Sequence, residues 1–163
     1  MLTTRSPEET QQFGERLAAQ LRAGDVVALI GDLGSGKTTM IQGLARGLGL
    51  ASSVKSPTFV LLREYPGLVP LVHIDGYRLE GESSVVWLDV EWVFSPRKIT
   101  VIEWADRFEG VLPDERLELR LAHRSTNQRS IALTGHGARA QAVVRAMQQA
   151  TPSRTGSTPK DSA

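Results

Sequence analysis

The chain has 163 residues, of which 40% are hydrophobic and 23% charged, and its formal net charge at pH 7 is +1. This size and balance predict one globular domain with a buried core, without the overall basic field that nucleic-acid-binding proteins use. Cysteine is absent, which excludes disulfides and thiol chemistry, and with no apolar run of about 18 residues and no signal peptide we expect a cytoplasmic protein without membrane contact.

The first predicted element is a helix that begins after Ser6. The Ser6 hydroxyl suits the N-cap, Pro7 suits the first turn, and Glu9 stands where a capping box requires an acidic residue. The apolar residues that continue this helix toward Gly24 at helical spacing are Phe13, Leu17, Ala18 and Leu21. The continuous apolar run Val26–Ile30 that follows predicts a buried parallel strand.

A phosphate-binding pattern starts where this strand ends. The pattern G-x-x-x-x-G-K-[ST] is matched by Gly31-Asp32-Leu33-Gly34-Ser35-Gly36-Lys37-Thr38, and a helix is predicted from there to about residue 47. A strand, a glycine-rich loop and a helix in this order form a P-loop, whose backbone amides surround the phosphates of a nucleotide. The predicted nucleotide-binding residues of this segment are Asp32, Leu33, Gly34, Ser35, Gly36, Lys37, Thr38 and Thr39.

The residue types of this loop match the chemistry of a nucleotide phosphate. Its glycines permit a left-handed backbone and let the N–H groups turn inward. Lys37 supplies a positive charge between the β- and γ-phosphates, and Thr38 offers a hydroxyl that ligates Mg²⁺. Asp32 is not needed to hold phosphate, and it is open whether it is a solvated loop carboxylate or places a water or a metal.

The rest of the chain predicts further strands and a final helix. Strands are expected at 58–64 and 71–75, joined as a hairpin through Pro66-Gly67. The later predicted elements are one or two short helices within 82–93, strands at 99–103, 117–122 and 130–134, and an amphipathic helix at 139–150. We therefore predict a single α/β domain over 1–150, a P-loop NTPase-like three-layer fold with a mixed, partly antiparallel sheet flanked by helices, and a disordered Ser/Thr/Pro-rich tail over 151–163.

Two apolar strands, at 71–75 and 99–103, each end in a carboxylate. Asp75 closes its apolar strand in the manner of a Walker B aspartate, and Glu103 closes another strand in the same way. Either residue alone could be a capping or surface group, but together with a P-loop they predict a joint site for Mg²⁺ and catalysis. His73 is interpreted as a packed sheet residue, and His123 and His136 as surface residues.

Five separated segments together resemble one known family. They are residues 31–39, Ser56-Pro57-Thr58-Phe59, the run His-Ile-Asp-Gly-Tyr-Arg-Leu at 73–79, Ile102-Glu103-Trp104 and Leu112-Pro113. In order and spacing, over about residues 6–121, they resemble the TsaE (formerly YjeE) ATPases. These support synthesis of threonylcarbamoyladenosine at position 37 of tRNAs. Gly76 departs from the resemblance, since a larger apolar residue is usual there.

The resemblance implies ATP and Mg²⁺ as ligands and a role for each matching residue. The catalytic residues it implies are Lys37, Thr58, Asp75 and Glu103. The Mg²⁺ ligands it implies are Thr38, Asp75 and Glu103. Thr58 matches a threonine in a switch-like loop that approaches the γ-phosphate, and Trp104 matches an aromatic neighbour of the nucleotide.

The resemblance also implies two protein partners, TsaB and TsaD. In such proteins TsaD carries out the transfer to tRNA, and ATP turnover by TsaE resets the complex between cycles. We therefore expect the chain to meet tRNA indirectly, through the complex.

Three other functions compete with this one. The main alternative is a small-molecule P-loop kinase, although a short chain leaves little room for an acceptor pocket and an arginine-bearing lid. A GTPase would need Asn-Lys-x-Asp, and the only asparagine, Asn127, is followed by glutamine. A tRNA-binding module would need a basic stripe or an aromatic platform. We interpret Arg120, Arg124 and Arg129 as solvated residues. Two other arginines, Arg78 and Arg107, are candidates for an arginine finger.

Overall fold

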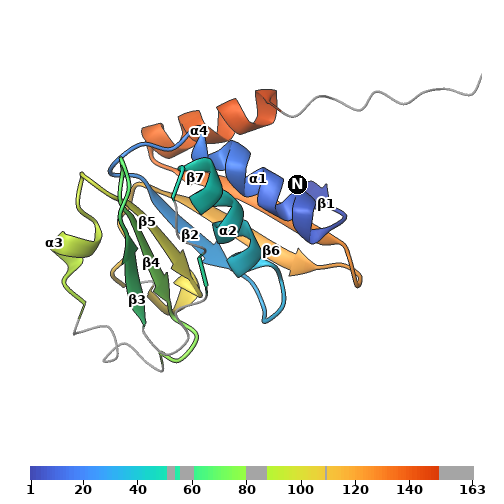
Figure 1. Ribbon diagram of the computed structural model, residues 1–163, viewed down its shortest axis with the longest axis horizontal. Coiled ribbons are helices and arrows are strands. Elements are labelled where there is room, and N and C mark those ends of the chain that lie inside the picture. The colour runs from blue at the N-terminus through green and yellow to red at the C-terminus, as the bar shows by residue number, and fades with distance from the viewer. Residues whose placement is uncertain (51–53, 56–60, 80–87, 109, 151–163) are drawn as a thin grey trace, which may run out of the picture.

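Seven β-strands form one mixed sheet in the described part of the chain, in the order β1-β7-β6-β2-β5-β4-β3. The structure is a computed structural model that describes residues 1–50, 54–55, 61–79, 88–108 and 110–150 (Figure 1). The strands are β1 Leu2–Thr4, β2 Val26–Ile30, β3 Leu62–Tyr65, β4 Leu71–Asp75, β5 Ile99–Glu103, β6 Arg116–His123 and β7 Arg129–His136. The helices are α1 Pro7–Ala18, α2 Lys37–Gly47, α3 Val90–Val93 and α4 Ala138–Gln149, with a 3-10 helix, η2, at Ala105–Phe108.

Strand pairing explains why the candidate site lies at one edge of the sheet. β2 pairs in parallel with β5 and with β6, and β5 pairs in parallel with β4. The carboxyl ends of β2, β4 and β5 therefore meet at the same edge. The remaining pairs, β3 with β4, β6 with β7 and β1 with β7, are antiparallel. The predicted mixed, partly antiparallel sheet is confirmed.

Alternating side chains give the sheet two buried faces. Val27 and Leu29 of β2 pack in the cluster that also takes the buried residues of α1, α2 and α4. Val26 and Ala28 pack in the opposite cluster, with buried residues of α3 and η2. Figure 1 shows α3 on one side of β3, β4 and β5, and α1 and α2 on the other. The predicted three-layer arrangement is confirmed, because residues of a buried parallel strand face a covered surface on both sides.

Local sequence signals account for most element boundaries. Ser6 is extended at the N-cap of α1 and its hydroxyl accepts from the Glu9 amide at 3.1 Å, as the capping pattern predicts. The β3–β4 hairpin is confirmed by antiparallel pairing, although the described part of β3 starts at Leu62 and residues 58–60 lie outside the described residues. Helix α1 ends at Ala18 rather than near residue 24.

Other elements differ from the sequence prediction or lie beyond what the structure describes. Strand β1 and helix η2 were not predicted, since three or four residues are too few to show a periodic pattern. Within 82–93 the described helix is α3, and residues 82–87 lie outside the described part, as does the tail 151–163. No helix among the described residues has the length and apolar content needed to span a membrane.

Close contact between α1 and α2 gives a stability prediction. A Cβ placed on Gly43 of α2 would overlap the Gln11 carbonyl of α1. Helix propensity alone would make Gly43→Ala stabilising by about 1 kcal/mol, but overlap with buried backbone costs more. We expect this variant to lower the free energy of unfolding by about 2 kcal/mol in urea titration. The control is Gly110→Ala, where an added Cβ has no atom within 4 Å. Equal unfolding free energies for the two variants would contradict this account.

Candidate functional site

The P-loop joins the carboxyl end of β2 to the amino end of α2. Gly36 is the N-cap of α2 with φ 99°, and no side chain caps the helix, so its first amides are available to an anion. Gly31 passes so close to β6 that a Cβ would overlap the Leu121 carbonyl. Glycine is therefore required at Gly36 by conformation and at Gly31 by space.

Lys37 is 4% exposed and lies under the loop. Its Nζ donates to the carbonyls of Gly31 at 2.6 Å and Asp32 at 2.9 Å, and it lies 3.9 Å from the centroid of the Trp104 ring. Burial lowers the pKa of Lys37, while the carboxylates of Glu103 and Asp75 act in the opposite direction. An ammonium held by neutral carbonyls in a desolvated place favours an anionic ligand.

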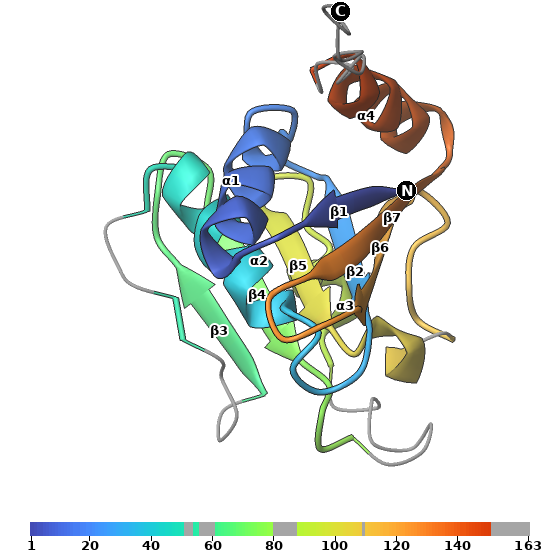
Figure 2. The same ribbon diagram turned by 90° about the vertical axis from the view of Figure 1, so that its right-hand side faces the viewer.

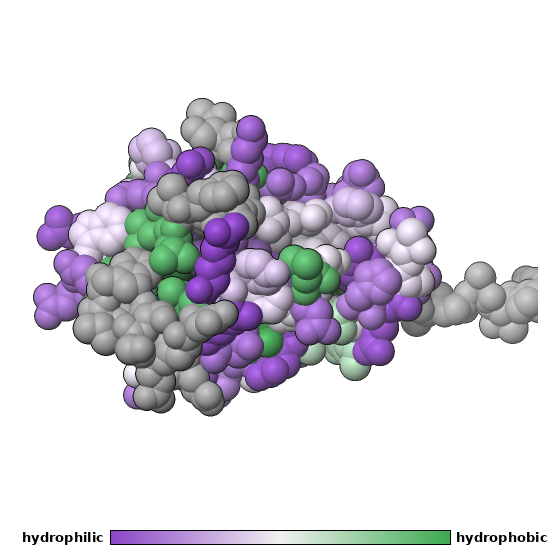
Figure 3. Space-filling view, turned by 90° about the horizontal axis from the view of Figure 1, so that it is seen from below, coloured by the Kyte–Doolittle hydropathy of each residue, from purple (hydrophilic) through white to green (hydrophobic). Residues whose placement is uncertain are grey.

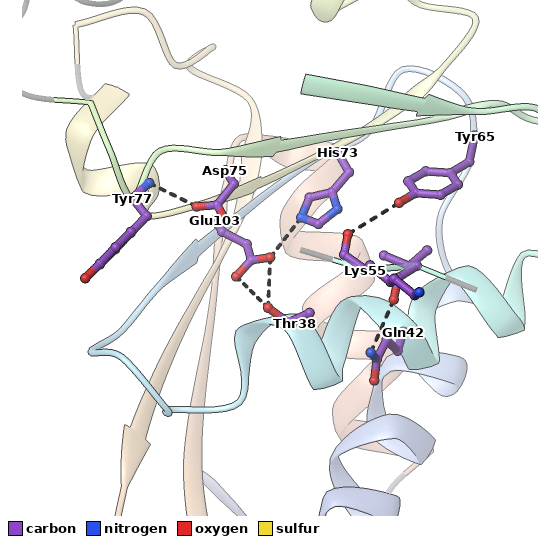
Figure 4. A network of polar contacts seen from close by, with 9 residues as sticks. Thr38, Gln42, Lys55, Tyr65, His73, Asp75, Tyr77 and Glu103 are labelled. Carbon is purple, nitrogen blue, oxygen red and sulfur yellow. Dashed lines mark hydrogen bonds and ion pairs between the residues drawn. The ribbon is translucent and has the colours of Figure 1, made fainter. Parts of the chain in front are cut away.

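The two predicted carboxylates lie side by side next to the start of α2. Asp75 and Glu103 are register partners on the parallel strands β4 and β5, and they are 4% and 3% exposed. Thr38 Oγ1 lies 3.1 Å from each carboxylate oxygen of Glu103 and donates to them (Figure 4). Asp75 accepts from the Tyr77 amide at 2.9 Å. The structure thus brings together the three oxygen-bearing residues that the sequence assigned to a metal.

His73 contributes more to this network than its sequence position indicated. It is fully buried in β4, as a packed sheet residue should be, and its Nε2 lies 2.8 Å from Glu103 Oε1. The alternation of β4 places Asp75 on the same side of the strand as His73. No sequence signal predicts the contact with Glu103, because it joins two different strands.

Aromatic and cationic side chains lie together next to the end of β5. Trp104 has φ 58°, the only positive φ of a non-glycine residue among those described. Its ring lies 5.2 Å from the Tyr77 ring and 5.1 Å from the Arg107 guanidinium. Arg107 donates to the carbonyls of Gly76, Tyr77 and Leu79, so in this structure the candidate arginine finger holds the loop after β4. Arg78, the other candidate, is exposed on that loop.

The departure at Gly76 has a packing explanation. A Cβ on Gly76 would overlap the ring of Phe108, which is 1% exposed on η2. The space that a larger residue would need is thus filled from another element.

A cavity of about 390 Å³ connects these groups. Its lining residues are Leu33, Gly34, Gly36, Lys37, Thr38, Thr39, Asp75, Tyr77, Glu103, Trp104 and Arg129. Figure 3 looks at the face that carries the strand ends and shows apolar residues among hydrophilic ones. Leu33 is 75% exposed and Tyr77 40% exposed, so the rim of the cavity has apolar character.

Two predicted residues do not line this cavity, and a third, Thr58, lies outside the described residues. Ser35 is buried with its hydroxyl 3.4 Å from Lys37 Nζ, and Asp32 meets the same Nζ through its carbonyl. Conversely, Tyr77 and Arg129 line the cavity without having been assigned to it. No motif marks Arg129, which lies far along the sequence and reaches the loop only through sheet pairing.

A second cavity, of about 280 Å³, lies at the amino end of β2, away from the P-loop. Three of its charged residues are joined by hydrogen bonds. Arg139 pairs with Asp25 at 2.8 Å, and Glu115 accepts from the Arg139 amide at 2.8 Å at the start of α4.

Comparisons with known proteins agree with this geometry. The family model for threonylcarbamoyl adenosine biosynthesis protein TsaE matches residues 4–131. The chain is 42% identical over 137 residues to the tRNA threonylcarbamoyladenosine biosynthesis protein TsaE of Bacillus subtilis, covering 83% of this chain and 85% of that protein. It is 42% identical over 139 residues to the protein of that name from Streptomyces coelicolor, covering 79% and 92%. The crystal structure of Bacillus subtilis YdiB superposes with a TM-score of 0.79 at 33% identity, covering 91% of this chain and 93% of that one.

Proposed function

The chain belongs to the TsaE family of tRNA threonylcarbamoyladenosine biosynthesis proteins, and we propose that it is an ATPase that serves this modification. The observation that carries the proposal is the cavity in which P-loop amides, the buried Lys37 ammonium and the carboxylates of Asp75 and Glu103 meet. A cation and oriented amides at one wall bind phosphate, and carboxylates facing them suit a metal bound to that phosphate.

Nucleotide binding in this proposal begins with Lys37. The contacts of its Nζ with the carbonyls of Gly31 and Asp32 hold the ammonium inside the loop. An incoming triphosphate offers the charged partner that these carbonyls do not, so its β- and γ-phosphates are drawn to this point. The amides at the start of α2 then receive the phosphate oxygens, and Trp104 borders the bound nucleotide.

The residues present fit Mg²⁺. The donor set of Thr38, Asp75 and Glu103 consists of oxygens, which Mg²⁺ prefers. Among the described residues no group of three or more His, Cys, Asp or Glu side chains could hold a metal, so the set is incomplete without phosphate oxygens and water. That is the usual situation for Mg²⁺ in nucleotide sites. When bound, the ion neutralises charge on the β- and γ-phosphates.

The carboxylates and Lys37 have separate roles in the proposed hydrolysis. We assign Asp75 to orient the attacking water and Lys37 to stabilise charge on the transferred group, with Thr58 approaching the γ-phosphate. The water oxygen bonds to the γ-phosphorus while the bond from that phosphorus to the β–γ bridging oxygen breaks. ADP, inorganic phosphate and one proton are the products. His73 holds Glu103 in place through its 2.8 Å contact, in the way that residues behind metal ligands orient them.

Partners complete the proposed role. We propose that the chain acts with TsaD and TsaB-like proteins, that ATP hydrolysis drives or resets their transfer complex, and that tRNA is met through them. Family membership supports this, and so do the exposed Leu33 and Tyr77 beside the cavity, since apolar groups at a rim suit a protein contact.

The proposal is tested by reconstitution. ATP hydrolysis is measured for the chain alone and with the TsaB–TsaD pair, and threonylcarbamoyladenosine is quantified in added tRNA by mass spectrometry. We expect slow hydrolysis alone, about tenfold faster hydrolysis with the pair, and several modified tRNAs per complex only when ATP and the chain are present. Repeated modification without the chain, or rapid ATP-dependent phosphorylation of a small metabolite, would contradict the proposed function, the second in favour of a kinase.

A further inference from the structure

Arg129 lies where two cavities meet beside the P-loop. It lines the 390 Å³ cavity together with Lys37 and Glu103. It also lines a smaller one of about 40 Å³, whose other lining residues are Ser6, Pro7, Thr10, Gly36, Thr39, Thr126 and Asn127. Among the described residues, Gly36 and Thr39 are the others that border both cavities. Figure 2 shows the turn between β6 and β7 near the loop that precedes α2.

The position of Arg129 is fixed by backbone and side-chain contacts. Its backbone is paired on both sides in the sheet, with Thr4 of β1 and with His123 of β6. Its Nη1 donates to the carbonyls of Ser125 at 3.1 Å and Gln128 at 3.1 Å. The side chain is half-buried, and its Nε lies 3.9 Å from the place of an added Cβ on Gly36. The guanidinium is thus held over the amino end of α2.

The direction of a bound triphosphate determines which phosphate Arg129 meets. Lys37 and the carboxylates of Asp75 and Glu103 set the γ-phosphate end of the large cavity. The P-loop amides cradle the α- and β-phosphates beyond that end. Arg129 lines the same cavity together with Thr39 and with Gly36, the N-cap of α2, to which its side chain lies close. The smaller cavity, of about 40 Å³, has room for a few water molecules and is too small to enclose a purine base. A phosphate held by the amides at the amino end of α2 would therefore lie within reach of Arg129.

We propose that Arg129 is a substrate-binding residue that contacts the α-phosphate of the nucleotide. This inference rests on the nucleotide site proposed above. A guanidinium offers parallel N–H donors that match two phosphate oxygens, and a half-buried, preorganised one loses little side-chain entropy on binding. The interaction is made equally with ATP and with ADP, and it does not reach the γ-phosphorus. Arg129 consequently sets affinity for the nucleotide and leaves the chemical step unchanged.

The test uses calorimetry on the full chain to measure its affinities for ATP, ADP and pyrophosphate, each in the presence of Mg²⁺. Pyrophosphate fills the places of the β- and γ-phosphates without an α-phosphate. We expect Arg129→Ala to weaken ATP and ADP binding by about 30-fold and pyrophosphate binding by less than about twofold. Arg129→Lys keeps the charge without the planar fork and should lose about tenfold for both nucleotides. In hydrolysis, KM should rise with kcat unchanged.

The matched control is Arg124→Ala. Arg124 is exposed on the same turn, donates to the Ser130 hydroxyl at 2.9 Å, and lines neither cavity, so its loss should leave all three affinities at the wild-type values. Thermal unfolding shows whether each variant is folded. If Arg129→Ala does not fold, the affinities of Arg129→Lys test the assignment. Wild-type nucleotide affinity in Arg129→Ala, or an equal loss of pyrophosphate, would overturn the assignment. A wild-type chain that binds neither ATP nor pyrophosphate would instead overturn the nucleotide site itself.

Discussion

Replacing Lys37 with methionine is expected to lower kcat/KM for ATP hydrolysis by about 1000-fold and to remove measurable nucleotide binding at millimolar ATP. Methionine keeps most of the packing volume of the lysine stem and removes the charge. A loss of about 4 kcal/mol of transition-state stabilisation corresponds to that factor, and it is the size expected when a desolvated cation facing a transferred phosphoryl group is removed. Steady-state phosphate release and calorimetry measure the two effects.

The fold itself should not suffer from this change. Burial lowers the pKa of Lys37, so the folded chain without nucleotide holds a charged group that it disfavours. Removing the ammonium relieves that cost but also removes its hydrogen bonds to the Gly31 and Asp32 carbonyls. These two effects oppose each other, so the free energy of unfolding of Lys37→Met should stay close to the wild-type value. The control is Lys98→Met, because Lys98 is half-buried and charged but does not line the cavity. Near-normal hydrolysis by Lys37→Met would disprove the proposed mechanism.

Much of this site could be predicted from sequence because its parts are local. The P-loop is contiguous, and each glycine, lysine and threonine in it has a role that its neighbours define. Asp75 and Glu103 were found because an apolar strand that ends in a carboxylate is visible in a short window. That the two strands are parallel neighbours was not predicted from the sequence, and the register of β4 and β5 shows it.

The parts that could not be predicted depend on tertiary contacts. Arg129 was interpreted as a solvated residue, since nothing in an arginine at the start of a strand shows that β7 pairs with β1 near the P-loop. His73 was interpreted only as a packed residue, because its contact with Glu103 joins two different strands. The strand β1 is three residues long, and its existence depends on pairing rather than on its own sequence.

The second large effect is expected at Glu103. Glu103→Gln keeps the side-chain volume and an oxygen that accepts from Thr38, but it replaces a charged Mg²⁺ ligand with a neutral one. We expect the Mg²⁺ concentration for half-maximal hydrolysis to rise by about 10-fold or more and kcat to fall about 100-fold. A titration of phosphate release against Mg²⁺ at saturating ATP measures both quantities. The control is Glu64→Gln, an exposed carboxylate on β3 whose contact is Lys98 at 3.3 Å.

Metal-free binding separates Glu103 from Lys37. Without Mg²⁺ the Glu103 carboxylate repels the γ-phosphate, so Glu103→Gln should bind ATP in the presence of a chelator at least as tightly as the wild type does. Lys37→Met should bind it more weakly under the same conditions, because it lacks the charge that attracts phosphate. If both variants lost metal-free ATP binding to the same extent, the division of the cavity into a phosphate wall and a metal wall would be wrong. Damage to the fold would weaken metal-free ATP binding in both variants. Changes of opposite sign in the affinities of the two variants would therefore reflect the separate roles of the two side chains.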